Sequence, residues 1–280
     1  MGQAPHTEVV NRDKILIFIP AYNCAPQIGR VLRKLNNVPA GTFAEVLVLD
    51  NQSKDGTGDA ATAVLPEVTS LPVTIARNRA NYGLGGSHKT AFAYAATHGF
   101  THVVVLHGDD QGNILDLLPV LAAGKHRTLD ACLGSRFMSG SKTPGYSLFR
   151  LIGNRAFNLL FSAAAQRWVT DLGSGLNLFG KAIFTDPDVF HYSDDLRFNC
   201  YLLLGLTDKK RKLTFFPITW SEEDQISNVK IFSQAVKTLE IVREFVLRRQ
   251  FFRTGEHRSV LHESYVFDIV ASNRTVENPR

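Results

Sequence analysis

The chain has few of the residues that build disulfide frameworks and metal clusters. Its 280 residues include three cysteines, Cys24, Cys132 and Cys200, which are far apart and outside any Cys-x-x-Cys or Cys/His cluster. The pattern excludes a disulfide scaffold and a structural zinc site, and we expect buried thiols in a reducing cytosol. A chain of this length can bury a core without such links.

Long hydrophobic runs are also missing. The longest, residues 156–165, has about half of the roughly 18 residues that a membrane span needs, so we expect a buried helix there. The first residues, MGQAPHTEVVNRDK, show no basic segment followed by an apolar core, so we expect no signal peptide. These absences predict a cytoplasmic protein, with peripheral contact at the cytoplasmic face of a membrane left open.

The charge balance gives weak information about partners. The net charge of +5 favours anionic ligands, but the chain has no nucleic-acid motif and no dense basic stripe with interleaved aromatics. We therefore expect no nucleic-acid partner. Phosphorylated ligands or an anionic membrane surface account for the charge equally well.

The first half of the chain alternates apolar runs with helical patterns. Strands are expected at 14–20, 45–50, 73–76 and 102–106, and helices at about 25–35, 57–64 and 87–97. Such an order predicts βαβ units with a mostly parallel sheet. Ligands of these sheets bind at the carboxyl ends of the strands. Polar residues follow the predicted strands at those ends, namely Tyr22, Asn23, Asp50, Asn51, Asn81, Asp109 and Asp110.

The second half is less regular. Strands are expected at 130–134 and 213–220, a loop then a strand within 171–180, and a helix at 150–167. A long helix at 227–253 carries arginines beside apolar residues, a pattern that suits either an anionic membrane or packing on the domain. We divide the chain into a catalytic domain, residues 1–225, and a C-terminal amphipathic helix and tail, residues 226–280.

The segment His107-Gly-Asp-Asp-Gln111 carries the most chemistry. Closely spaced carboxylates after a buried strand suit a hard divalent cation that bridges diphosphate oxygens. Asp109 and Asp110 could also simply cap a following helix. A P-loop at 83–90 is a competing interpretation, but His88 stands where the phosphate cradle requires glycine.

In their order, these motifs resemble family-2 glycosyltransferases of the GT-A fold, in particular dolichyl- and polyprenyl-phosphate sugar synthases. The resemblance covers about residues 15–239. It rests on eight short segments and one arginine: 17–23, 50–57, 81–89, His107–Gln111, 134–137 with Arg150, 171–175, 217–220 and 227–230.

The resemblance implies a GT-A domain, a Rossmann-like α/β sheet flanked by helices, with a C-terminal helical extension. It also implies a UDP- or GDP-sugar donor and inversion by single displacement. The donor-binding residues that it implies are Pro20, Ala21, Tyr22, Asn23, Asp50, Asn51, Ser53, Asn81, Gly85, Lys89, Gly108 and Asp109.

The same resemblance implies a metal site at the end of the fourth strand. Asp109, Gln111 and His107 are the expected ligands of Mg²⁺ or Mn²⁺, and His107 stands where the family usually has an aspartate. Imidazole binds manganese more readily than magnesium.

On the acceptor side, a phosphate monoester is already anionic at neutral pH and needs arginines rather than a base. Arg136 and Arg150 flank a Gly/Ser/Pro-rich loop and are expected to bind a lipid-linked phosphate. A saccharide or natural-product hydroxyl would instead need a general base, for which Asp194 and Asp195 are the candidates. A third hypothesis is a non-catalytic nucleotide-binding module. The sequence leaves open a homo-oligomer.

Overall fold

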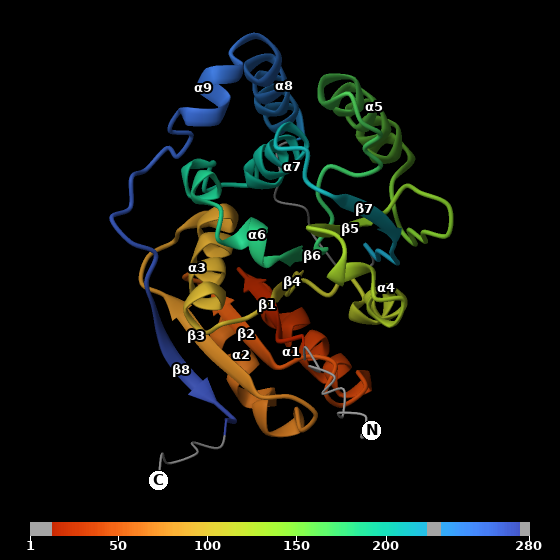
Figure 1. Cartoon of the computed structure of the whole chain (residues 1–280). Helices are drawn as coiled ribbons and strands as arrows, with labels where there is room; N and C mark the ends of the chain where they lie inside the picture. The colour runs from red at the N-terminus through yellow and green to blue at the C-terminus, as the bar shows by residue number, and fades with distance from the viewer. Residues whose placement is uncertain (1–12, 223–230, 275–280) are drawn as a thin grey trace, which may run out of the picture.

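A computed structural model describes residues 13–222 and 231–274, and these form a mixed sheet of eight strands flanked by helices (Figure 1). The strand order is β7-β5-β6-β4-β1-β2-β3-β8. The strands are β1 (Ile15–Ala21), β2 (Glu45–Asp50), β3 (Val73–Asn78), β4 (His102–Leu106), β5 (Ala131–Ser135), β6 (Leu176–Gly180), β7 (Leu213–Pro217) and β8 (Phe267–Ser272). The predicted α/β architecture is confirmed.

The centre of the sheet is parallel. β1 pairs in parallel with β2 and β4, and β2 with β3, so the carboxyl ends of these four strands share one edge. β6 runs antiparallel to both β4 and β5, while β7 is parallel to β5. β8 closes the other side by pairing antiparallel with β3.

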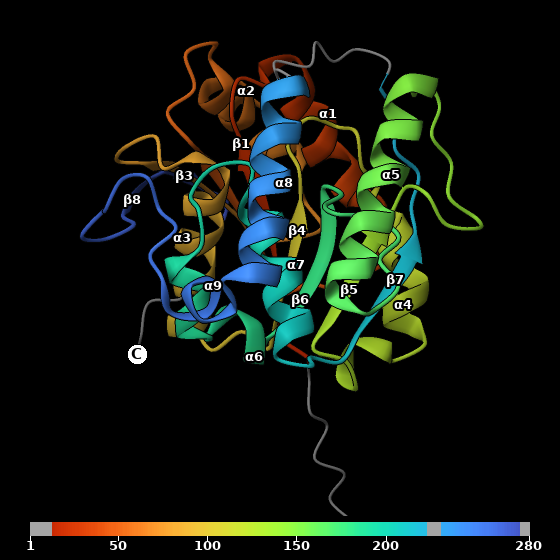
Figure 2. The same cartoon turned by 90° about the horizontal axis from the view of Figure 1, so that it is seen from above.

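Helices cover both faces of the sheet, as Figures 1 and 2 show. They are α1 (Ala25–Lys34), α2 (Thr57–Val64), α3 (Gly83–Thr97), α4 (Leu118–Ala122), α5 (Leu148–Ala165), α6 (Lys181–Phe184), α7 (Phe198–Asp208), α8 (Ile231–Leu247) and α9 (Arg249–Thr254). Short 3₁₀ helices occur at η1 (Leu35–Asn37), η2 (Leu65–Glu67), η3 (Ile114–Leu117), η4 (Lys125–Arg127) and η5 (Pro187–His191).

The central strands β1, β2 and β4 are buried on both faces, which explains their continuous apolar sequences. In β1, Leu16 and Phe18 belong to a core shared with residues of α3, α7 and α8, whereas Ile17 and Ile19 belong to a second core with residues of α1 and α2. Alternate side chains of a strand point to opposite faces, so each run supplies both cores.

Several elements differ from the expectations. α3 begins at Gly83 rather than residue 87, so its first turn is formed by the glycine-rich residues 83–86, whose low helix propensity suggested a loop. The predicted helix 227–253 is broken at Arg248, whose φ and ψ of −132° and 47° are not helical. Its first residues, like the predicted motif at 227–230, lie outside the described residues.

The sequence did not reveal α7 or β8. α7 is buried nearly all round, so it lacks the apolar periodicity of a surface helix. β8 is a half-exposed edge strand with a charged residue, Asp268, among its apolar ones. The C-terminal elements share the main core, to which Ile241, Phe245 and Phe252 belong. Among the described helices, none is long and apolar enough to cross a bilayer.

A buried ion pair connects α3 to the segment before α7. Lys89 Nζ donates to Asp194 Oδ1 at 2.6 Å and to the carbonyl oxygen of Tyr192, and both charged side chains are buried. Tyr265, from the segment between α9 and β8, donates its hydroxyl to the same carboxylate oxygen at 2.8 Å. The pair therefore anchors two distant segments to one helix.

Removing one partner of this pair should destabilise the fold strongly. Asp194→Ala leaves the Lys89 ammonium buried without its counter-charge, so the free energy of unfolding should fall by about 3–5 kcal/mol in urea titration. The exposed pair Arg79–Asp268, with an N–O distance of 2.8 Å, provides the control, and Asp268→Ala should hardly move the urea midpoint. Equal midpoints for the two variants would contradict this account.

Candidate active site

Strained loops leave the sheet where β1, β2 and β4 end. Asn23, Gln52 and Asp110 follow these strands and have φ values of 49°, 64° and 62°. Non-glycine residues rarely adopt positive φ, and such strain collects where the surrounding structure needs it for function. The three loops therefore mark one edge of the sheet as the candidate site.

Asp50 lies at the centre of this edge. It is paired in register with Ala21 of β1 and Arg77 of β3, and its side chain is buried. Asp50 Oδ1 accepts a hydrogen bond from Ser53 N at 2.9 Å, and Oδ2 lies 3.7 Å from Arg77 Nε. The carboxylate thus holds the β2 loop and carries a charge at the strand end.

An amide network joins the end of β2 to the start of α3. Asn51 Oδ1 accepts from Asn78 Nδ2 at 3.0 Å and from Tyr82 N at 2.9 Å. Asn51 Nδ2 in turn donates to Asn81 Oδ1 at 2.9 Å. Asn78 was not predicted as a site residue, although it is the last residue of β3 and the other site residues also lie at the ends of their strands.

The β1 loop is tied to the same edge. Asn23 N donates to Ser53 Oγ at 3.0 Å, and Gly108 N, after β4, donates to Pro20 O at 3.1 Å. Tyr22, between them, is exposed. The structure therefore brings together most of the predicted donor residues, namely Pro20, Ala21, Tyr22, Asn23, Asp50, Asn51, Ser53, Asn81 and Gly108.

Two predicted donor residues are placed differently. Lys89 is buried in its pair with Asp194, so its ammonium is enclosed by protein rather than open to a phosphate. Gly85 N donates to Asp194 O at 2.7 Å, and a Cβ on Gly85 would lie 2.3 Å from Ser193 O. The glycines of this motif allow close packing of α3 against residues 193–194, and the donor-binding role expected for Gly85 and Lys89 stays a prediction.

The two adjacent aspartates after β4 point to different partners. Asp110 pairs with Arg30 at 2.8 Å and Lys34 at 2.6 Å, both on α1. Asp109 Oδ1 accepts from Gln111 N at 3.3 Å, and its Oδ2 lies 4.0 Å from His107 Nδ1. Asp109 and His107 therefore form the candidate metal-binding pair, while Asp110 braces the loop against α1.

His107 is in the protonation state that metal binding requires. Burial, with a contribution from the charge of Arg136, lowers the pKa of His107 to about 4, so the ring is neutral at pH 7. Its Nε2 is buried and makes no hydrogen bond within residues 13–222 and 231–274. The described residues include no group of three His, Cys, Asp or Glu side chains that could hold a metal. The pair fits a cation whose other ligands come from a bound diphosphate.

The predicted acceptor arginines both contact Tyr146. The Arg136 guanidinium carbon lies 6.0 Å and that of Arg150 5.0 Å from the centre of this ring. Arg150 Nη1 donates to Glu222 Oε2 at 2.5 Å, and its side chain is about one-third exposed. The structure therefore brings the two arginines around one aromatic ring.

Arg136 is more fully engaged than Arg150. Its Nε and Nη2 donate to the two oxygens of Asp171 at 2.8 and 2.7 Å. The rings of Phe137 and Trp220 lie 5.0 and 5.3 Å from its guanidinium carbon. Burial disfavours the charged form, but the Asp171 carboxylate outweighs it and raises the pKa of Arg136. This arginine is suited to positioning the 171–175 loop.

That loop connects the arginines to the metal motif. Gly175 O accepts from His107 N at 2.9 Å. A Cβ on Gly175 would lie 2.7 Å from the His107 ring and 2.8 Å from Trp220, so only glycine fits between them. Ser221 N donates to Gln111 O at 2.9 Å and completes the link. The metal motif and the arginines therefore belong to one site.

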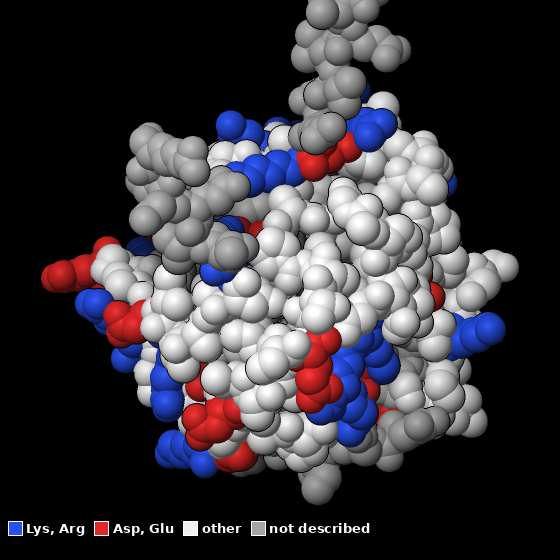
Figure 3. Space-filling view, turned by 90° about the horizontal axis from the view of Figure 1, so that it is seen from below, with Lys and Arg blue, Asp and Glu red and all other residues white. Residues whose placement is uncertain are grey.

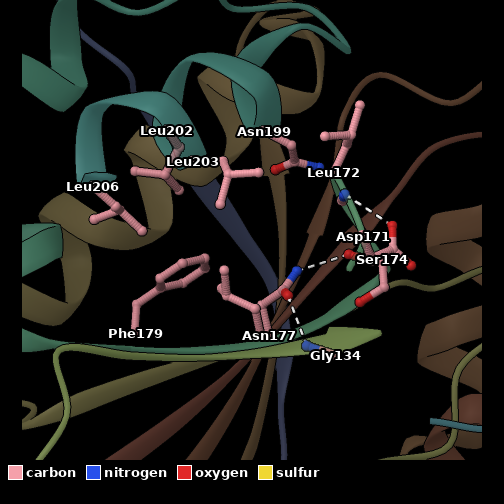
Figure 4. A pocket seen from close by; sticks show the side chains of 12 residues that line it. Gly134, Asp171, Leu172, Ser174, Asn177, Phe179, Asn199, Leu202, Leu203 and Leu206 are labelled. Atoms are coloured by element: carbon pink, nitrogen blue, oxygen red, sulfur yellow. Dashed lines mark hydrogen bonds between the residues drawn. The ribbon is translucent and has the colours of Figure 1, made fainter. Parts of the chain in front are cut away.

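A narrow cavity lies behind the same loop (Figure 4). Asn177 Nδ2 donates to Ser174 O at 2.7 Å, and Asn177 Oδ1 accepts from Gly134 N at 3.2 Å. Leucines of α7 form the opposite wall, as Figure 4 shows. These contacts support the loop from behind. Sequence reasoning assigned no role to Asp171, Tyr146, Trp220 or Glu222, which are distant in sequence from the arginines they contact or lie in irregular segments.

Asp195, the candidate base, is engaged with a cation. Its Oδ1 and Oδ2 each lie 3.0 Å from Arg197 Nε, and Ser193 Oγ donates to Oδ1 at 2.9 Å. Partial burial tends to raise the pKa of Asp195, but the hydrogen bonds from Arg197 and Ser193 prevail and lower it. The residue adjoins Gly83 at the start of α3, because a Cβ on that glycine would lie 3.5 Å from its Cα.

Comparison with known proteins places the fold and site in context. The chain is 29% identical over 166 residues to an undecaprenyl-phosphate mannosyltransferase of Micrococcus luteus, covering 59% of this chain and 66% of that protein. It is 27% identical over 138 residues to a dolichol-phosphate mannosyltransferase of Pyrococcus furiosus, covering 49% and 37%. The matches thus span less than two thirds of these relatives.

A solved structure shows the same fold. Glucosyl-3-phosphoglycerate synthase of Mycobacterium tuberculosis, in complex with Mn²⁺, UDP and glucosyl-3-phosphoglycerate, superposes with a TM-score of 0.54 and 16% identity, covering 92% of this chain and 87% of that one. The family model described as glycosyl transferase family 2 matches residues 16–195, more than half of the chain. With the GT-A sheet and this match, the chain belongs to glycosyl transferase family 2.

Proposed function

We propose that this chain transfers a hexose from a UDP- or GDP-sugar to a polyprenyl or dolichyl phosphate at the cytoplasmic face of a membrane, with inversion. The observation that carries the acceptor assignment is Arg150, a partly exposed arginine in the same site as the metal motif. The two mannosyltransferase relatives, both named for polyprenol-type phosphates, support it.

On the donor side, the strand ends around Asp50 and Asn51 would hold the nucleoside. Asp109 and His107 would hold Mg²⁺ or Mn²⁺, with Gln111 beside them in the same loop. When bound, the cation neutralises charge on the leaving nucleoside diphosphate. The Mn²⁺ and UDP in the M. tuberculosis neighbour are consistent with this arrangement.

On the acceptor side, Arg150 would bind the lipid phosphate, and Arg136 would hold the 171–175 loop through Asp171. A phosphate monoester carries its negative charge at neutral pH, so its attacking oxygen needs no general base. The alternative, a saccharide or natural-product hydroxyl, needs such a base. Asp195 is partly exposed, which favours that alternative, but Arg197 lowers its basicity. The lipid phosphate is therefore the better-supported acceptor.

The donor assignment predicts a metal-dependent gain in stability. A nucleotide-sugar at a hundredfold excess over its Kd should stabilise the protein by about 2.7 kcal/mol, because it binds only the folded state. Thermal-shift measurements with UDP- and GDP-hexoses, with and without Mn²⁺, test this and identify the base. A family-2 fold that responds to none of these donors would contradict the proposal.

The adjacent aspartates should respond differently to the same substitution. Asp109→Asn removes a metal-binding charge and should lower kcat by about 100-fold or more. Asp110→Asn is the matched control, because this side chain pairs with α1 and asparagine tolerates its positive φ. Its turnover should stay near the wild-type rate. Equal losses in the two variants would argue against Asp109 as the ligand.

A lipid-phosphate acceptor predicts different effects for substitutions of Arg150 and Asp195. Arg150→Ala should raise KM for a short-chain prenyl phosphate by about 10- to 100-fold, the value of a charge-assisted hydrogen bond, with KM for the donor unchanged. Asp195→Asn should keep kcat within a few-fold of the wild-type value. Near-complete loss of turnover in Asp195→Asn, with donor binding intact, would instead favour a hydroxyl acceptor.

A further inference from the structure

α5 carries an apolar stripe on its solvent-exposed side, in addition to the apolar residues that it buries. Leu148, Phe149, Ile152 and Leu159 are 69%, 74%, 62% and 62% exposed. Leu148, Ile152 and Leu159 follow helical spacing and, with the exposed Ala156 and Ala163 between and beyond them, form one apolar stripe. A helix that packs on a soluble protein normally turns such a stripe inward.

The inner face of α5 combines apolar packing, with Phe161 buried in the main core, and polar contacts. Asn158 Nδ2 donates to Thr170 O at 2.6 Å, and Ser162 Oγ accepts from Val169 N at 2.9 Å. Asn154 Nδ2 donates to the Tyr146 hydroxyl at 2.8 Å. Phe161 and these bonds together hold this face inward, so the apolar stripe lies outside.

The segment that carries the stripe has charged residues of one sign, although its Arg136 and Arg150 are ion-paired with Asp171 and Glu222 from other segments. Residues 131–170 contain no Asp or Glu, but they contain Arg136, Lys142, Arg150, Arg155 and Arg167. Arg155 is exposed beside the stripe, and Trp168, just beyond the helix, is 71% exposed. On the opposite face of the molecule, charged groups of both signs lie side by side (Figure 3). An apolar stripe with cations and an exposed tryptophan suits the interface of an anionic bilayer.

The neighbouring helix α8 has a different surface. Its exposed apolar residues, Val236, Leu239, Val246 and Leu247, lie among the exposed charged residues Lys237, Glu240 and Arg243. Such mixed exposure is ordinary for a solvated helix. Figure 2 shows α5 and α8 side by side on one face, so the contrast distinguishes α5 from the C-terminal helix that the sequence suggested for membrane contact.

We propose that α5 lies flat on an anionic lipid bilayer and inserts Leu148, Phe149, Ile152 and Leu159 among the lipid chains. The proposal rests on the lipid-phosphate function above and adds the surface that brings the enzyme to its acceptor. Arg150 follows Phe149 directly but faces Tyr146 and Glu222. A phosphate at the bilayer surface is therefore presented at the arginine end of the site.

Co-sedimentation of the full chain with vesicles tests the proposal. Wild type should bind phosphatidylglycerol–phosphatidylcholine vesicles at least tenfold more strongly than pure phosphatidylcholine vesicles. The double variant Ile152→Asp/Leu159→Asp should lose at least tenfold in binding. Leu261→Asp/Ile269→Asp is a matched control, because these residues are 67% and 64% exposed far from α5 in sequence. It should bind like wild type, as should Leu239→Asp/Leu247→Asp on α8.

Three results would overturn the proposal: no wild-type binding to either vesicle, undiminished binding of the α5 variant, or equal loss in the controls. Sedimentation velocity tests whether the stripe instead binds a second copy of the chain. If wild type is a dimer and the α5 variant is a monomer, the stripe is an interface between copies.

Turnover of a short-chain prenyl phosphate, dissolved without vesicles, separates this proposal from the proposed function. The α5 variant should keep that activity at the wild-type level. If Arg150→Ala had the wild-type KM for this acceptor, the acceptor assignment would be wrong. The membrane proposal would still be judged by the vesicle-binding measurements alone.

Discussion

The parallel pairing of β1 with β2 and β4 is the constraint on which the site depends. It places the loops after Ala21, Asp50 and Leu106 at one edge, where Pro20 O accepts from Gly108 N and Ser53 Oγ from Asn23 N. The positive φ values of Asn23, Gln52 and Asp110 are the local cost of turning the chain there. A shift in register would separate these groups at once.

The ion pairs around that edge differ in how deeply they are buried. Lys89–Asp194 and Arg136–Asp171 are buried and hold segments in place, whereas Arg150 is partly exposed and has one carboxylate partner, Glu222. A buried charge that already has its counter-charge gains little from a ligand, so exposure separates positioning residues from binding residues here. Asp110 is likewise paired, with Arg30 and Lys34, whereas Asp109 lies beside His107.

Sequence reasoning could predict the sheet and most of the donor edge, because buried parallel strands are continuous apolar runs and their polar ends stand out. It could not predict that Lys89 is enclosed, since its partner Asp194 is 105 residues away and belongs to an irregular segment. The Arg136–Asp171 pair was missed for the same reason. Residues 156–165 were expected to form a buried helix; Phe161 is in the core but Leu159 is exposed, because an apolar run does not show which of its residues face inward.

The antiparallel pairing of β8 with β3 has a consequence for the order of folding. Val73 N donates to Asn273 Oδ1 across 200 residues, so this edge of β3 stays open until residues 267–273 have been synthesised. Contacts of such separation form slowly, and an uncovered strand edge invites pairing with other chains. The nascent protein therefore passes through a stage in which β3 is an aggregation-prone edge, and chaperone contact at that stage would protect it.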